Sequence, residues 1–592
     1  MTDPVLPTTP RLTDLWTDAL QNMNGALTGV MSGVPMAKTT KPFDPATVMK
    51  AVTDFGMSLG NQPAQLFNLQ TQAIKQWSDF WMSSLTPRTA ETRPMVAPVR
   101  GDRRFGDEEW SDSPYYRTLR DAYLLAGMQM HQMVDLADTP DGASKAMVNF
   151  LLEQYLNAVA PTNFLLTNPQ AMKRTLETGG ANLVSGFANM LQDLSTGKGI
   201  VKRRSTDVFK KGENIAATPG SVVFQNHLFQ LIQYDPVTPD VHQQPILYVP
   251  PLVNKYYMID LQPKSSLIRW MVGQGRTVFV VSWVNPDDTH RDYGLTEYVR
   301  DGIIAAIGAV GKATGETVVD LFGFCMGGTL IAVALAVLAA RGKAAQVGSA
   351  TRIGSMVDFA DMRGWAAFTD EAHLDALEGH LENQGYIDSS ELQQLFSAMR
   401  SNDLIWTSVV NHYLLDKEAP PSDLMFWFED GSNIPEAFLK TYNQGLLKGN
   451  ALRIPGAVEV DGVPIDLSKI TTPLLLIALK DDHVSAWEAV YAGAKLFGGP
   501  VTFILGGSGH NAGVINPPAA NKHGYWRNPN LPETADAWLE GAEKHPGSWW
   551  PVWDAWLTGH GDGKRVPPRV VGSGPLPALE PAPGSYMRTS HP

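Results

Sequence analysis

Gly323-Phe324-Cys325-Met326-Gly327-Gly328 is the stretch that decides the fold of this 592-residue chain. Residues 317–322 before it are β-branched and apolar and predict a buried strand. Residues 329–338 after it are strong helix formers. A strand, a tight turn and a helix, with glycine two residues to either side of a nucleophile, form the G-x-S-x-G elbow, here with cysteine in place of serine. The sequence therefore predicts a nucleophile elbow with Cys325 at its tip.

An elbow places the nucleophile at the N-terminus of a helix, where free amide groups and the positive end of the helix dipole favour a thiolate. The backbone N–H of Met326 is then the first candidate oxyanion donor. The alternative is that Cys325 is a small buried apolar residue in a glycine-rich turn. It is the only cysteine, so the chain can form no internal disulfide, and we expect a cytoplasmic protein.

Composition narrows the class of protein. The chain is 44% hydrophobic and 18% charged, and its length predicts two domains. A net charge of −13 argues against nucleic acid as a partner. The first residues carry neither a basic nor an apolar leader, and the longest apolar run, 330–340, is too short to span a membrane.

The first third of the chain predicts helices at about 115–136, 142–158 and 169–194, after a polar linker at 86–98. We therefore expect a mostly helical N-terminal domain over residues 1–205. One earlier helix carries an apolar stripe, which either packs on its own domain or docks on a partner or hydrophobic particle. The stripe comprises Leu66, Leu69, Ala73, Trp77 and Trp81.

From residue 206 onward, strand and helix patterns alternate, which predicts an α/β-hydrolase fold with a mostly parallel sheet. The interval 363–446 is helical and aromatic and predicts a cap inserted between later strands. Residues 559–592 are rich in glycine and proline and predict a tail that wraps or dangles. The expected strands lie at 221–224, 229–234, 246–249, 278–283, 317–322, 353–357, 474–479 and 501–505.

A thiol nucleophile needs a base, and the base needs an orienting carboxylate. In this fold they follow later strands in the order nucleophile, acid, base. Asp482 and His510 each follow a predicted strand and complete that order. Asp358 and Asp481 are rival acids. The rival base, His483, sits on the acid's own loop, where its neighbour is poorly placed to orient it.

The second oxyanion donor should come from the loop after the 246–249 strand, at Leu252 or Val253. No metal-ligand spacing occurs in the chain. The segment 506–509 lacks the lysine and hydroxyl residue of a phosphate-binding loop.

These residues belong to longer motifs that resemble the class I, single-subunit polyhydroxyalkanoate synthases, from about residue 102 to the C-terminus. The family's Cys, Asp and His fall on Cys325, Asp482 and His510. The family usually has Arg where Val284 stands and Ile where Asn511 stands, so the monomer preference is left open. The matching motifs are PPLVNKYY at 250–257, DLQP at 260–263, GFCMGGT at 323–329, DH at 482–483, SGHNAGVINPP at 508–518, GSWWP at 547–551 and EPAPG at 580–584.

The resemblance implies a (R)-3-hydroxyacyl-CoA substrate, most simply 3-hydroxybutyryl-CoA, and a polyester product formed with release of CoA. It implies no cofactor beyond the CoA that the substrate carries. It also implies a homodimer attached to polymer granules in the cytoplasm, with the N-terminal helices serving dimerisation and granule association. Two other classes stay open: a thioesterase or intracellular polyester depolymerase, which admits water, and a non-catalytic granule-coating protein.

Overall fold

The structure, a computed structural model, describes residues 45–84, 96–98, 102–139, 142–195, 208–418 and 420–589. The chain divides into two compact units, one of residues 1–205 and 395–420 and the other of residues 206–394 and 421–592. Most of the expected linker at 86–98 and the expected domain boundary after residue 205 lie outside the described residues.

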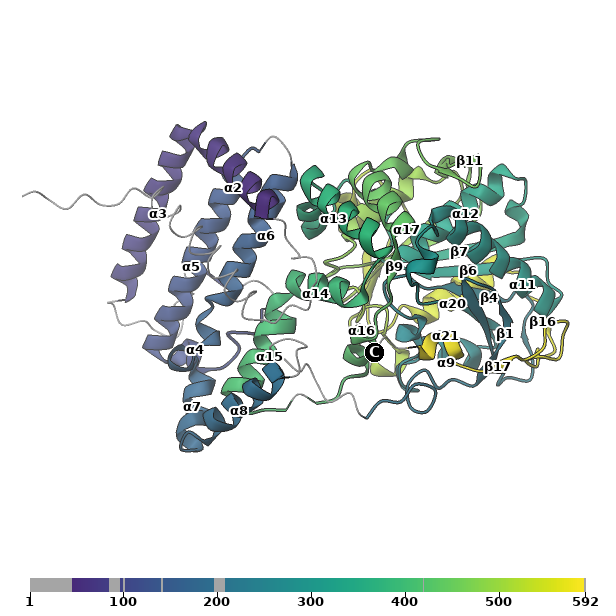
Figure 1. Ribbon diagram of the computed structural model, residues 1–592, viewed down its shortest axis with the longest axis horizontal. Helices are drawn as coiled ribbons and strands as arrows, with labels where there is room; N and C mark the ends of the chain where they lie inside the picture. The colour runs from purple at the N-terminus through teal and green to yellow at the C-terminus, as the bar shows by residue number, and fades with distance from the viewer. Residues whose placement is uncertain are drawn as a thin grey trace, which may run out of the picture. The chain divides into compact units, whose positions relative to one another are not determined.

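The second unit is built on one 11-stranded sheet in the order β15-β14-β13-β12-β7-β6-β4-β5-β2-β1-β17 (Figure 1). The six central strands, which run from β13 to β5 in this order, pair in parallel. The strands at both ends of the sheet pair antiparallel. The strand bounds are β1 Gly220–Gln225, β2 Phe229–Tyr234, β4 Ile246–Val249, β5 Val278–Trp283, β6 Val319–Phe324, β7 Val347–Ile353, β12 Leu474–Leu479, β13 Val501–Gly506, β14 Tyr525–Arg527, β15 Glu543–His545 and β17 Glu580–Pro581.

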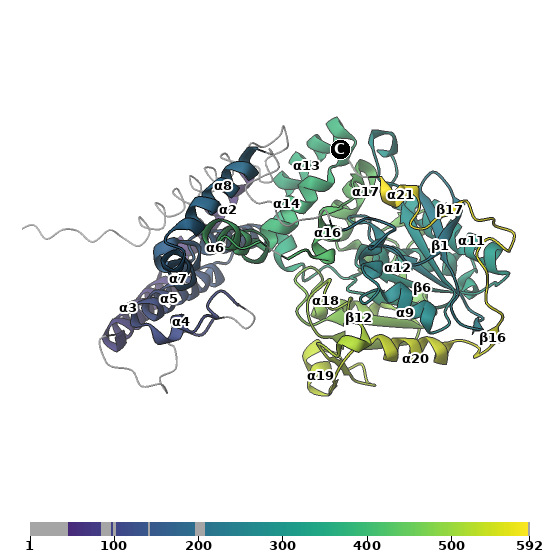
Figure 2. The ribbon, with the colours of Figure 1, turned by 90° about the horizontal axis from the view of Figure 1, so that it is seen from below.

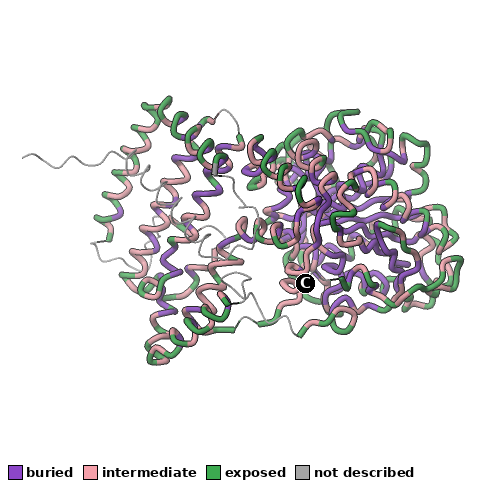
Figure 3. The backbone as a smooth tube through the Cα atoms, in the orientation of Figure 1, coloured by how far each residue is buried: buried purple, intermediate pink, exposed green. Residues whose placement is uncertain are grey.

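Helices cover both faces of this sheet (Figure 2). Trp553 of α20 (Trp550–His560) donates to Thr351 of β7 at 2.9 Å. The next residue of β7, Arg352, donates to the Gly328 carbonyl of α12 (Met326–Ala340) at 2.8 Å. Adjacent residues of a strand point to opposite faces, so α12 and α20 lie on opposite sides. Burial is concentrated in the strands between them (Figure 3), and the predicted α/β-hydrolase fold is confirmed.

The structure corrects the position of one expected strand and shows the course of the C-terminal tail. The strand expected at 353–357 is wrong: β7 ends at Ile353, because Gly354 takes a positive φ of 51° and turns the chain away. The glycine- and proline-rich tail wraps and does not dangle. Its β17 pairs with β1 at the sheet edge.

The first unit is helical, as expected for the first third of the chain. Its helices between residues 45 and 195 are α2 Pro45–Gly60, α3 Pro63–Ser84, α4 Glu109–Asp112, α5 Pro114–Leu136, α6 Gly142–Ala158, α7 Pro169–Glu177 and α8 Ala181–Ser195. In the described part of the chain, no helix of either unit combines the length and the apolar character needed to cross a membrane.

Part of the expected cap belongs to this first unit. Residues 395–420, which include the short π-helices η8 (Asn402–Trp406) and η9 (Val410–Leu414), cluster with the N-terminal helices. Tyr413 donates to the buried Asp193 of α8 at 2.9 Å. The rest of the expected interval 363–446 stays with the sheet and is mostly helical: η7 Arg363–Phe368, α13 Glu371–Gln384, α16 Asp423–Glu429, α17 Glu436–Lys440 and η10 Thr441–Lys448, with α14 (Ser389–Met399) spanning the change of unit.

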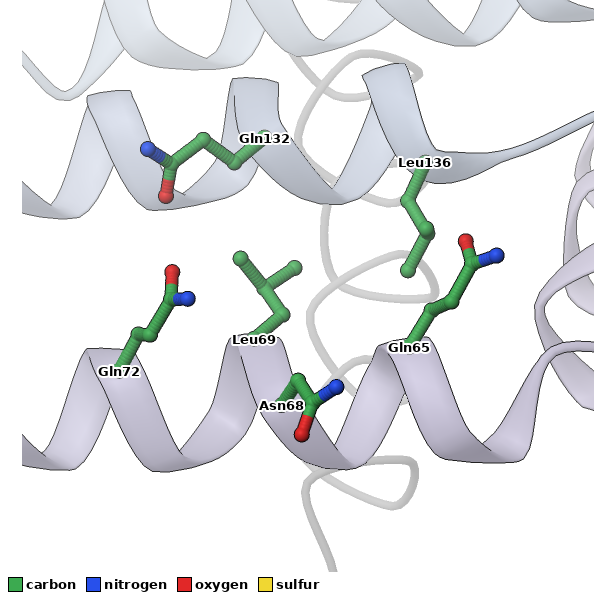
Figure 4. A pocket seen from close by; sticks show the side chains of 6 residues that line it. All are labelled: Gln65, Asn68, Leu69, Gln72, Gln132 and Leu136. Carbon is green, nitrogen blue, oxygen red and sulfur yellow. The ribbon is translucent and has the colours of Figure 1, made fainter.

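The α3 stripe packs partly on its own unit. Leu66, Leu69, Ala73 and Trp77 are half-buried, and the Trp77 indole donates to Gln129 of α5 at 2.9 Å. Trp81 remains 55% exposed. A shallow groove of about 300 Å³ lies between α3 and α5 (Figure 4). Four of its six lining side chains are amides and two are leucines: Gln65, Asn68, Leu69, Gln72, Gln132 and Leu136.

The crossing of α8 with residues 407–414 predicts a large difference between two glycine substitutions. A Cβ on Gly186 would lie 1.9 Å from the Tyr413 carbonyl oxygen, whereas a Cβ on Gly56 of α2 would meet nothing within 4 Å. Gly186→Ala should therefore destabilise the first unit by about 1–3 kcal/mol. Gly56→Ala should stabilise it by roughly 0.5–1 kcal/mol, as alanine does in an open helix. Hydrogen exchange of amides 407–414 and thermal unfolding measure both, and equal effects would contradict the packing.

Candidate active site

Cys325 occupies the sharp turn between β6 and α12. It is the N-cap of α12 and has φ 53° and ψ −130°, a backbone conformation that residues other than glycine rarely adopt. The turn is possible because its neighbours lack side chains. A Cβ on Gly323 would lie 2.7 Å from Ile331, and one on Gly327 would lie 2.2 Å from the Val249 carbonyl oxygen. The predicted elbow geometry is thus present around Cys325.

The structure brings His510 and Asp482 together beside this turn. His510 follows β13 and Asp482 follows β12, and parallel strands carry both loops to the same sheet edge. The Nδ1 atom of His510 lies 2.6 Å from Asp482 Oδ2. The other carboxylate oxygen accepts the backbone N–H groups of Val484 and Ser485, both at 2.8 Å. These bonds fix the carboxylate and leave Nε2 of the imidazole for a nucleophile.

The charges around His510 favour its protonated form. Burial alone lowers the pKa of this imidazole, but the charges of Asp482 and the Cys325 thiolate, with hydrogen bonds to both side chains, outweigh it and raise the pKa to about 10. His510 is 7% exposed, and the Phe324 ring lies against it at 4.6 Å between ring centroids. The arrangement can therefore hold a thiolate–imidazolium pair away from bulk water.

The rival residues are placed differently. Asp358 accepts the Ala360 N–H at 3.0 Å and the Asn450 side-chain amide at 2.8 Å, so its carboxylate organises the chain after β7. Asp481 is exposed. His483 follows Asp482 directly, but the imidazole that Asp482 orients is that of His510.

One candidate oxyanion donor and the start of the loop that carries the other two lie at the elbow. The Met326 N–H heads α12 and, like every first-turn amide, has no intrahelical acceptor. Gly327 brings the same helix end against Val249, so the loop carrying Leu252 and Val253 starts next to Met326. Leu252 and Val253 stay predicted as the second donor.

Two aromatic residues near the thiol were missed by the sequence analysis. Burial and the nearby charge of Cys325 raise the pKa of both Tyr248 and Tyr442 above the ordinary phenol value. Tyr442 packs between Phe359 and Phe438, at 6.1 and 5.8 Å between ring centroids. The only sequence signal for Tyr442 is the aromatic content of the expected cap, which does not single out one residue.

In the part of the chain that the structure describes, no cluster of three or more His, Cys, Asp or Glu side chains could hold a metal ion. The side chains brought together at the elbow are a thiol, an imidazole and a carboxylate.

Comparison with known proteins shows the family to which the chain belongs. Residues 101–271 match the family described as "Poly-beta-hydroxybutyrate polymerase (PhaC) N-terminus". The chain is 39% identical to a poly(3-hydroxyalkanoate) polymerase of Methylorubrum extorquens, over 93% of this chain and 94% of the relative. It is 38% identical to the corresponding polymerase subunit of Cupriavidus necator, over 94% and 97%. The chain therefore belongs to the poly(3-hydroxyalkanoate) polymerases, a family of acyltransferases.

Proposed function

We propose that this enzyme polymerises (R)-3-hydroxyacyl-CoA, most simply 3-hydroxybutyryl-CoA, into a polyester and releases CoA. Cys325 is the nucleophile, His510 the base and Asp482 the residue that orients the base. CoA is part of the substrate, and no separate cofactor takes part. The observation that carries the proposal is the buried His510 side chain, which contacts Asp482 at 2.6 Å and the thiol of the strained Cys325.

Loading exchanges one thioester for another. His510 takes the proton of the Cys325 thiol, and the thiolate sulfur attacks the acyl-CoA carbonyl carbon. The tetrahedral oxyanion collapses, the bond to the CoA sulfur breaks, and His510 returns the proton to CoA. Because a thioester is broken and another is formed, the acyl group stays activated on the enzyme, whereas a serine ester would lose that activation.

Elongation requires an alcohol as the second nucleophile. The 3-hydroxyl of one hydroxyacyl group loses its proton to His510 and attacks the carbonyl carbon of an acyl thioester. An ester bond forms, and the thiolate that leaves can take up the proton. Free alcohols are far weaker acids than thiols, so this step needs the base and its orienting carboxylate more than loading does.

Water competes with the 3-hydroxyl, and the site has features that limit its access. His510 and Asp482 are 7% and 8% exposed. Tyr442, from the expected cap, contributes an aromatic ring near the thiol between Phe359 and Phe438. A dry site favours polymer over free hydroxy acid.

The test is an assay with 3-hydroxybutyryl-CoA that follows CoA release and recovers insoluble polymer. The wild-type enzyme should produce both. Cys325→Ala should abolish acylation and turnover together, because the chain has no second thiol. Release of CoA with free hydroxy acid would identify a hydrolase, and polymer formation by Cys325→Ala would refute covalent catalysis at this residue.

The two candidate acids, Asp482 and Asp358, should differ in how their loss affects loading and elongation. Asp482→Asn should keep the first CoA release within about tenfold of wild type while slowing polymer formation about 100-fold or more, since only elongation must deprotonate an alcohol. Asp358→Asn should lower stability by about 1–2 kcal/mol through its lost hydrogen bonds, without changing the ratio of the two steps. Single-turnover CoA release and steady-state polymer formation measure both variants. A selective elongation defect in Asp358→Asn alone would move the acid to that residue.

We further propose that the enzyme is a cytoplasmic homodimer that attaches to its polyester granules through the first unit. The support is a row of exposed side chains on α3 that shares Trp81 with the predicted stripe. Phe67, Ile74 and Trp81 recur every seven residues and are 67%, 68% and 55% exposed. Such a row of large apolar side chains on one helix is suited to an apolar surface.

Phe67→Gln combined with Ile74→Gln should reduce the fraction of enzyme that sediments with polymer granules about threefold or more, because less apolar surface is removed from water. Glutamine keeps the helix propensity of α3 high. Lys75→Gln, an exposed change on the same helix, is the matched control. Light scattering measures the molar mass and so reports whether the substitutions affect dimerisation and not granule attachment. Unchanged sedimentation and unchanged mass would exclude this face of α3 from both roles.

A further inference from the structure

The chain that follows α16 lies along the loop expected to supply the second oxyanion donor. Asn254 and Gly431 form an antiparallel bridge. The Ser432 N–H donates to the Val253 carbonyl oxygen at 3.0 Å. The Trp427 indole N–H donates to the Lys255 carbonyl oxygen at 2.7 Å. Three hydrogen-bonding contacts therefore attach residues 253–255 to residues 427–432.

Asp430 is the charged centre of this attachment. Its Oδ1 accepts Lys255 Nζ at 2.7 Å. Its Oδ2 accepts the Tyr257 hydroxyl at 2.8 Å and lies 2.5 Å from Lys211 Nζ. The side chains of Lys255, Asp430 and Lys211 are 5%, 13% and 13% exposed. One carboxylate thus joins two lysines and a phenol in a mostly buried cluster.

The charge of Lys255 depends on this carboxylate. Burial and the nearby charge of Lys211, against the opposing effect of Asp430, lower the pKa of Lys255 to about 8. Lys255 also donates to the Thr589 carbonyl oxygen at 2.7 Å. Without Asp430, the cluster would hold two neighbouring lysines with no carboxylate between them, and Lys255 would lose the partner that fixes its position.

The beginning of the same loop is held from the sheet. The Trp283 indole at the end of β5 donates to the Pro250 carbonyl oxygen at 3.1 Å. Residues 251 and 252 therefore lie between a fixed point at Pro250 and the attached stretch 253–255. Oxyanion donors act through placement, and a displacement of about 1 Å can cost roughly 100-fold in rate.

We infer that Asp430 is a positioning residue for acyl transfer. It holds the loop at 250–255 so that the backbone amide of Leu252 or Val253 faces the acyl carbonyl oxygen at Cys325, opposite the Met326 amide. The inference rests on the proposed function, because it presupposes that an acyl thioester forms on Cys325. Asp430 itself touches neither the thiol nor the base in this scheme.

The experiment compares two reactions of the same thiol. Acylation by 3-hydroxybutyryl-CoA builds a tetrahedral oxyanion, whereas alkylation by iodoacetamide is a direct displacement at carbon and builds none. Asp430→Asn should slow single-turnover CoA release roughly 10- to 100-fold. It should change the alkylation rate of Cys325 less than about threefold, since the thiolate–imidazolium pair is intact. Tyr257→Phe, which removes only one hydroxyl contact, should give a smaller acylation defect in the same direction.

Asp423→Asn is the matched control, because it makes the same chemical change in α16 at a side chain that contacts Ser265 and Leu424. It should leave both rates near wild type. Equal losses of acylation and alkylation in both Asp430→Asn and Tyr257→Phe would show a merely structural role and overturn the inference. Wild-type rates in both variants would overturn it too. Failure of the wild-type enzyme to release CoA would instead refute the proposed function.

Discussion

The backbone conformation of Cys325 is the constraint on which the rest of the site depends. A non-glycine residue at φ 53° costs about 1–3 kcal/mol and persists only where its surroundings hold it. Here the Cys325 N–H donates to the Ile353 carbonyl oxygen at 2.8 Å, and α12 behind it is buried from Met326 to Leu338. The hydrogen bond to β7 and the packing of buried α12 therefore hold the strained conformation. This conformation places the sulfur at the sheet edge where His510 lies.

Much of the site could be predicted from sequence because it follows from strand order. Parallel strands end at one edge, so the residues after the strands at 474–479 and 501–505 had to approach the elbow. The structure places Asp482 and His510 there with a 2.6 Å contact. Apolar runs with clear turn signals also located most of the sheet. The strand expected at 353–357 was wrong because a single glycine with positive φ ended β7 earlier than its apolar neighbours suggested.

The features that could not be predicted depend on contacts between distant segments. Nothing in residues 395–420 indicates that Tyr413 will meet Asp193, some 220 residues earlier. Asp430 is one carboxylate among the chain's 60 acidic residues, and only the folded chain brings Lys211, Lys255 and Tyr257 to it. Tyr442 is similar, since its place near the thiol is set by packing against Phe359 and Phe438. Local pattern carries no information about such pairings.

Two of these contacts between distant segments, at Tyr413 and at Trp427, lie close together along the chain. Residues 395–420 belong to the first unit, and the next residues, starting at Pro421, return to the second unit and lead into α16. Residues 421–426 lead directly to Trp427, whose indole N–H donates to the Lys255 carbonyl oxygen. Pro421 stiffens this short return by fixing its φ angle. Along the chain, the segment that packs on α8 is therefore followed within a few residues by the segment that contacts Lys255.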